Sequence, residues 1–142
     1  MEPATRKRVP PLATTTEEAI TTLANQALTS NERETAIHYL QYNPSGEGVN
    51  ALVAALRDRD PGVRYACSTA LATLGELALI PLLRAISSTD NDAMLREGAH
   101  RVLAHSTNRD VRDKTAELRK ALVGPGAQLA SMEEAAKLLY RN

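Results

Sequence analysis

The chain has 142 residues, 43% of them hydrophobic, and 17 basic residues balance 17 acidic ones. This length favours one domain, and because Phe and Trp are absent the core must be built from Ala, Leu, Ile and Val. The balanced charge argues against a dedicated nucleic-acid binder, the single cysteine excludes an internal disulfide, and no apolar run approaches the ~20 residues of a membrane span.

Residues 1–13 contain three prolines and a short basic run, Arg6, Lys7 and Arg8. This composition predicts a flexible arm before a single repeat domain of residues 14–142. The arm is interpreted either as a solvated tail or as a tether for an acidic partner. Thr15 and Glu18 then have the spacing of a capping box, which predicts the start of the first helix.

A second helix is expected to open at Ser30 or Asn31, which gives a first helix pair over about 15–42. The next pair, about 46–75, contains the clearest helix of the chain. Asp60 is a good N-cap, Pro61 suits the first helical position, and Gly75 supplies the stop. Between them, small and apolar residues recur at spacings of three and four: Val63, Ala66, Cys67, Ala70, Leu71 and Leu74.

A third pair is predicted over about 76–105 and a fourth over about 109–141. In the fourth pair, residues 123–130 read as a loop around Gly-Pro-Gly. Ser131 and Glu134 have capping-box spacing, which predicts that the last short helix begins there. This pair departs from the pattern of the others, as a terminal repeat that caps an array should.

The pairs share one register. Arg33, Arg64 and Arg96 are separated by 31 and 32 positions, and two further sets keep the same offsets from them, Ala36, Cys67 and Ala99, and Leu40, Leu71 and Leu103. A repeat of about 30 residues is typical of a solenoid. The sequence therefore predicts an all-α fold, an α-solenoid of about four antiparallel helix hairpins.

The motif resembles HEAT repeats, and more closely the short HEAT-like repeats named after phycobilisome lyases, over residues ~15–123. The resemblance implies a right-handed superhelix. It also implies that Asp60 with Arg64, and Asp92 with Arg96, form a structural ladder of hydrogen bonds within and between repeats. Four residues before Arg33 stands Thr29 rather than Asp, so we expect the ladder to stop there. The residues that carry the resemblance are Leu52, Leu56, Asp60, Pro61, Val63, Arg64, Ala66, Ala70, Leu71, Leu74 and Gly75.

The resemblance further implies that the second helix of each pair lines the concave side of the solenoid. By register, the solvent-facing positions of these helices form a predicted binding strip. Its mixture of charges suits a protein or peptide more than a phosphate backbone, which would favour repeated Lys or Arg. The strip consists of Glu34, His38 and Gln41; Tyr65, Ser68, Thr69 and Thr73; and Glu97, His100, Arg101 and His105.

No constellation in the sequence predicts a catalytic, cofactor or metal site. His100 and His105 are five positions apart, whereas two ligands on one helix face prefer three or four. Cys67 lies on an apolar helix face, which predicts a buried, inert thiol. The carboxylate pairs occur where first helical turns are expected, so capping explains them better than acid–base chemistry.

We therefore predict a cytoplasmic, non-enzymatic scaffold that binds a protein or peptide partner and no membrane; the partner's identity and the oligomeric state are left open. Two alternatives remain. A nucleic-acid binder would need ladder arginines that are free to form a basic stripe with the strip arginine: Arg33, Arg64, Arg96, Arg101 and Arg112. A bilin lyase or lyase accessory, suggested only by the family's name, would need a cavity large enough for a tetrapyrrole.

Overall fold

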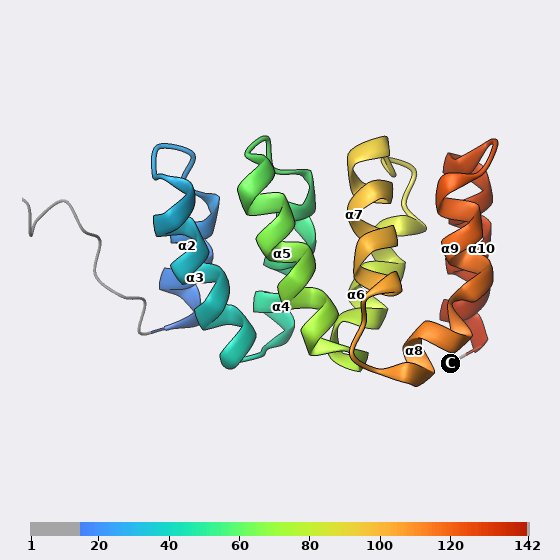
Figure 1. Cartoon of the computed structure of the whole chain (residues 1–142), viewed down its shortest axis with the longest axis horizontal. Coiled ribbons are helices and arrows are strands. Elements are labelled where there is room, and N and C mark those ends of the chain that lie inside the picture. The colour runs from blue at the N-terminus through green and yellow to red at the C-terminus, as the bar shows by residue number, and fades with distance from the viewer. Residues whose placement is uncertain (1–14, 142) are drawn as a thin grey trace, which may run out of the picture.

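A computed structural model describes residues 15–141, and these residues fold into α-helices and one short 3-10 turn (Figure 1). The predicted arm of residues 1–13 lies outside the described residues. The elements, in chain order, are α2 (Thr16–Ala24), α3 (Ser30–Tyr42), α4 (Gly46–Ala54), the 3-10 turn η1 (Ala55–Arg57), α5 (Pro61–Leu74), α6 (Glu76–Ile86), α7 (Ala93–Ala104), α8 (Arg109–Lys114), α9 (Ala116–Val123) and α10 (Ala127–Arg141).

The helices form two layers that run side by side along the molecule (Figure 1). The layer nearer the viewer, here called the front layer, contains α3, α5, α7 and α9, and each helix packs against the next. The rear layer contains α2, α4, α6 and α10, packed in that order. This regular succession of helix pairs confirms the predicted all-α solenoid.

Local signals fix the ends of most helices. The Asp60 carboxylate accepts a hydrogen bond from the Gly62 amide at 2.9 Å, Pro61 is the first residue of α5, and Gly75 ends the helix with φ of 60°. The predicted capping box at Thr15 and Glu18 is present at the start of α2. A second capping box, Thr29 with Glu32, opens α3 slightly earlier than predicted.

The last pair reverses the order of the first three. In those pairs the first helix lies in the rear layer, whereas α9 packs on α7 in the front layer and the helix that follows it, α10, packs on α6 in the rear. The predicted single helix after residue 109 is divided at Thr115, which is buried and donates a hydrogen bond to the Val111 carbonyl at 2.7 Å. The chain turns there, and the reversed pair closes the end of the stack.

The predicted helix start at Ser131 is wrong. Helix α10 begins at Ala127, directly after Gly126, whose φ of 61° ends the preceding turn. Ser131 is therefore inside the helix and fully buried, where its hydroxyl accepts a hydrogen bond from the Asn91 amide group at 3.0 Å. The capping-box spacing of Ser131 and Glu134 occurs here without a helix terminus.

The space between the layers is filled with aliphatic side chains, as the composition predicted. Leu40, Leu56, Leu71 and Leu103 are at most 1% exposed, and they belong to one continuous core. The layers approach closely at Gly98, where an added Cβ would lie 3.1 Å from a Leu56 methyl group. Within residues 15–141, none of the helices combines the length and apolarity needed to cross a bilayer.

Candidate functional site

A groove of about 280 Å³ lies between α5 and α7 on the front layer. It runs from the middle of both helices towards their C-terminal ends, and it joins the second pair to the third. Six of the eleven predicted binding-strip residues line it. The lining residues are Tyr65, Ser68, Thr69, Ala72, Thr73, Arg101 and His105.

Arg101 and Tyr65 meet across this groove. The guanidinium carbon of Arg101 lies 5.6 Å from the centroid of the Tyr65 ring, within the range of a cation–π contact. Tyr65 is 62% exposed, although a large aromatic side chain usually gains free energy by burial. The contact therefore holds a cation and an exposed ring together at the surface.

Hydrogen bonding in the groove leaves several polar groups available. Thr73 donates from its hydroxyl to the Thr69 carbonyl at 2.9 Å, one turn earlier on α5. Within the described residues, the Thr69 hydroxyl and the His105 ring form no hydrogen bond, and no Asp or Glu lines the groove. The groove therefore presents an arginine, a histidine and hydroxyl groups without a negative charge among them.

One predicted strip residue is not at a solvent-facing position. Ser68 is 0% exposed, and its hydroxyl donates to the Tyr65 carbonyl at 2.8 Å. Ser68 has the register position of Ile37 and His100, and Ile37 is also fully buried. The side chain at this position turns toward the neighbouring helix in Ser68 and Ile37, so the prediction that Ser68 faces solvent was wrong.

The other strip residues lie outside the groove. Glu34, His38 and Gln41 are on α3, and His38 is exposed. Glu97 is exposed on α7, and His100 is half-buried on the same helix. The structure thus brings the four strip residues of the second pair together with two of the third pair, Arg101 and His105, whereas those of the first pair form no part of the groove lining.

A second set of polar groups forms hydrogen bonds between the repeats along one edge of the stack. This loop edge carries the turns before α3, α5, α7 and α10. Arg33, 2% exposed on α3, donates to the Leu23 carbonyl at 2.8 Å and to both oxygens of the Asp58 carboxylate in the next pair. The expectation that the ladder stops at Arg33 is therefore wrong, because Arg33 finds its carboxylate one repeat later.

The side chains of the four predicted ladder residues all form hydrogen bonds, although not with one another's side chains. Arg64 donates to the Asp58 carbonyl at 2.8 Å, and Arg96 donates to the carbonyl of Asn91 at 2.9 Å. Asp60 accepts from the Ser30 hydroxyl of the preceding repeat. Asp92 caps α7 by accepting from the Leu95 amide at 2.8 Å, and it lies 3.4 Å from the Arg57 guanidinium.

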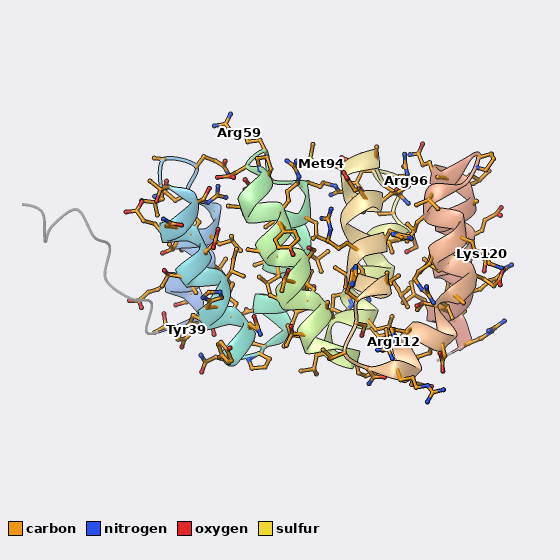
Figure 2. All side chains as sticks on the ribbon, viewed as in Figure 1. Tyr39, Arg59, Met94, Arg96, Arg112 and Lys120 are labelled. Carbon is orange, nitrogen blue, oxygen red and sulfur yellow. The ribbon has the colours of Figure 1, made fainter. Side chains whose placement is uncertain are left out.

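Three ladder residues were missed in the sequence: Arg57, Asp58 and Asn91. Arg57 donates to the Asp90 carbonyl at 3.0 Å and so joins the second pair to the third. Asn91 is fully buried and joins the third pair to α10 through Ser131. Figure 2 shows Arg96 near the loop edge and Arg112, which donates to the Ser106 carbonyl at 2.6 Å, at the other edge beside α8.

The pKa values of three carboxylates at the loop edge follow from these contacts. Burial opposes ionisation of Asp58, but hydrogen bonds from Arg33, Gln26 and the Asp60 amide outweigh it, and the pKa of Asp58 is lowered. The Ser30 hydrogen bond lowers the pKa of Asp60, and those from Ser88 and Arg57, with the charge of Arg57, lower that of Asp90.

Among the described residues, the thiol and the possible metal ligands show no arrangement suited to nucleophilic catalysis or metal binding. Burial raises the pKa of the Cys67 thiol to about 12, so the thiolate that acts as nucleophile or metal ligand is not formed near neutral pH. This confirms the predicted buried thiol. Within residues 15–141, no group of three or more His, Cys, Asp or Glu side chains could hold a metal ion.

Two other cavities lie on the rear layer, with volumes of about 300 Å³ and 260 Å³. The first lies between α2 and α4 and is lined mainly by Ile20, Leu23 and alanines, with Asp58 as its charged member. The second contains Pro44, Val49 and Pro81 and no charged residue. The α5–α7 groove differs from both because it is lined by a cation.

Comparison with known proteins gives one match. The family model for HEAT repeats matches residues 17–104, which is more than half of the chain. The matched segment covers α2 through α7, the three pairs that share one helix order, and it ends before the reversed pair. Neither the curated proteins nor the solved structures gave a match.

Proposed function

We propose that this chain, which belongs to the HEAT-repeat family, is a non-enzymatic scaffold that binds a protein or peptide on the front layer. HEAT repeats generally serve as protein-interaction scaffolds. The observation that carries the proposal is the α5–α7 groove, where an exposed Tyr65 and a surface Arg101 lie together. Tyr and Arg are enriched among the residues that dominate protein–protein binding energies.

The same surface supports a protein partner over a nucleic acid. The nucleic-acid alternative needs ladder arginines that are free, but Arg33, Arg64, Arg96 and Arg112 each donate hydrogen bonds to carbonyl or carboxylate groups of the fold. Arg101 remains as the only arginine of the expected stripe that forms no such bond. A single cation cannot neutralise the several phosphates that such binding requires.

The bilin-lyase alternative gains no support from the α5–α7 groove. Small-molecule sites have typical volumes of about 300–1,000 Å³, and the α5–α7 groove lies below this range. The groove also lacks the predominantly apolar lining that would bury a large conjugated ring system. A groove of this volume, lined mainly by polar side chains of two helices, is better suited to side chains of a partner that covers it.

Affinity capture from a lysate of the source cell tests the proposal. The bait variant Tyr65→Ala/Arg101→Gln/His105→Ala removes the groove's polar anchors. A matched control, Glu47→Gln/Asn50→Ala/Arg84→Gln, changes exposed residues of the rear layer. We expect a partner that the wild type and the control capture and that the groove variant loses, with unchanged circular dichroism in all three. Equal capture by both variants, or loss from both, would contradict a front-layer binding site.

A further inference from the structure

We infer that the α5–α7 groove binds an acidic peptide segment of the protein partner, with Arg101 pairing with an Asp or Glu carboxylate of that segment. This inference rests on the proposed function, because it names the chemistry that the front layer recognises. Three features of the groove carry it: the state of Arg101, the groups around Arg101, and the charges beside the groove.

Arg101 is an unpaired cation in a protein that pairs its other part-buried arginines. Of the described arginines that are not fully exposed, all but Arg101 donate a hydrogen bond to a protein group: Arg33, Arg57, Arg64, Arg96, Arg112 and Arg119. Among the described residues, the Arg101 side chain forms only the contact with the Tyr65 ring. Glu97, one turn earlier on α7, forms no ion pair with it, although an i,i+4 pair of this kind is common on helices.

The Tyr65 contact restrains Arg101 without using its donors. A guanidinium directs its five N–H groups outward in one plane. The cation–π contact, with the guanidinium carbon 5.6 Å from the centroid of the Tyr65 ring, leaves these groups available to a carboxylate. Restraining the side chain before binding reduces the conformational entropy lost on association. Arg101 is thus arranged to form a bidentate pair with a planar anion.

The remaining groove residues also favour an anion. His105 and Thr69 offer ring nitrogen and hydroxyl groups that form no hydrogen bond within the described residues, and no carboxylate lines the groove to repel an incoming one. The volume of about 280 Å³ limits the occupant to one or a few side chains. An Asp or Glu side chain with its neighbours satisfies both limits.

The charges beside the groove favour an isolated carboxylate over a phosphate backbone. Glu97 on α7 and Glu34 on α3 share the register position of Tyr65, and Glu97 is exposed. A polyanion laid across the front layer would meet both of these carboxylates as well as the one arginine of the groove. A peptide can place a single carboxylate at Arg101 and uncharged residues beside Glu34 and Glu97.

Titration followed by two-dimensional nitrogen–proton NMR tests this inference on the full chain. The probes are a capped heptapeptide with a single central Glu among uncharged residues, its counterpart with Gln in place of that Glu, and a short DNA duplex. We expect the acidic peptide to shift backbone amides of α5 and α7 around Tyr65 and Arg101, and the Gln peptide to leave them unchanged. Added salt should weaken the binding, because the paired charges lie at the surface.

Variants assign the effect to Arg101. Arg101→Gln should weaken binding of the acidic peptide about tenfold, the expected consequence of losing one charge-assisted pair. Arg84→Gln, which removes an exposed arginine of α6, should leave the affinity unchanged. Arg101→Lys should give an intermediate affinity, because lysine keeps the charge and loses the planar fork.

The inference is overturned if neither peptide shifts the groove, if both peptides bind equally, or if the DNA duplex shifts it and the acidic peptide does not. A peptide affinity that Arg101→Gln leaves unchanged overturns it as well. None of these results decides the proposed function, because the capture experiment uses the natural partner. Capture that depends on the groove, together with a failed peptide titration, would leave a scaffold that recognises some other chemistry.

Discussion

Arg33 and Arg101 lie in the same layer of helices, and their surroundings are opposite. Arg33 is 2% exposed and donates to the Leu23 carbonyl and to the Asp58 carboxylate. Arg101 lies at the groove, forms a cation–π contact with Tyr65, and its side chain has no acceptor among the described residues. At the loop edge, the charge of Arg33 is paired within the fold, whereas the charge of Arg101 at the groove has no paired carboxylate among the described residues. The difference separates a residue that holds the repeats together from one that is available to a partner.

The largest expected effect comes from removing Arg33. Replacement by Met leaves the Asp58 carboxylate without its cation and the Leu23 carbonyl without a donor, so Arg33→Met should lower the free energy of unfolding by about 3–5 kcal/mol. Urea unfolding followed by circular dichroism measures the change. Arg59→Met is the matched control, because Figure 2 shows Arg59 projecting outward from the turn before α5. Equal stability of the two variants would show that the ladder contacts of Arg33 do not stabilise the fold.

A smaller loss is expected at the junction with the reversed pair. Asn91 donates to the Ile86 carbonyl at 2.7 Å and to Ser131, and its side-chain oxygen accepts from Arg96 at 3.0 Å. Asn91→Ala should cost about 1–3 kcal/mol, because these buried groups lose their partner. In Asn91→Ala, the backbone amides of α9 and α10 should exchange hydrogen faster than those of α3. Uniform exchange rates along the chain would argue that this junction does not hold the last pair.

Stability should also fall with acid in a way that depends on Asp58. The pKa of Asp58 is lower in the folded protein than the usual 3.8, so the unfolded chain binds the proton more readily. The contribution of Asp58 is therefore fully present above about pH 5, declines as the pH approaches 3.8, and is lost below the folded pKa. Urea midpoints between neutral pH and pH 3 should fall less steeply for Asp58→Asn than for the wild type. Parallel curves would show that Asp58 is not held ionised by the ladder.

The smallest effect on stability is expected at the groove. Arg101→Gln removes no hydrogen bond or ion pair of the fold, so its unfolding free energy should lie within about 0.5 kcal/mol of the wild type. Differential scanning fluorimetry and urea unfolding measure it. A loss comparable to that of Arg33→Met would mean that Arg101 has a structural role, and the contrast between the two regions would fail.

Local signals in the sequence predicted most of the fold because they act within one helix. Asp60, Pro61 and Gly75 determine the ends of α5 through contacts a few residues away, and they needed no knowledge of the neighbours. The repeat register then predicted which positions pack, since each pair meets the next in the same way. The helix start predicted at Ser131 was wrong because α10 begins earlier, directly after Gly126, and a serine inside a helix has the same spacing to Glu134 as one at its cap.

Contacts between repeats were less predictable. Arg33 pairs with a carboxylate 25 positions later, so inspection of the four residues before it could not reveal the pairing. The reversed order of α9 and α10 depends on how the turn at Thr115 directs the chain, which no periodic pattern encodes. The groove could be predicted more fully than these contacts. The register placed Tyr65, Thr69 and Arg101 on one face, but it did not predict the contact between Tyr65 and Arg101.

The role of Arg101 is tested most directly by the dissociation constant of Arg101→Gln for the acidic heptapeptide, measured on protein whose urea midpoint equals that of the wild type. We expect a folded variant that binds the peptide about tenfold more weakly. Wild-type affinity in the folded variant would contradict the assignment of Arg101 as the groove's binding cation.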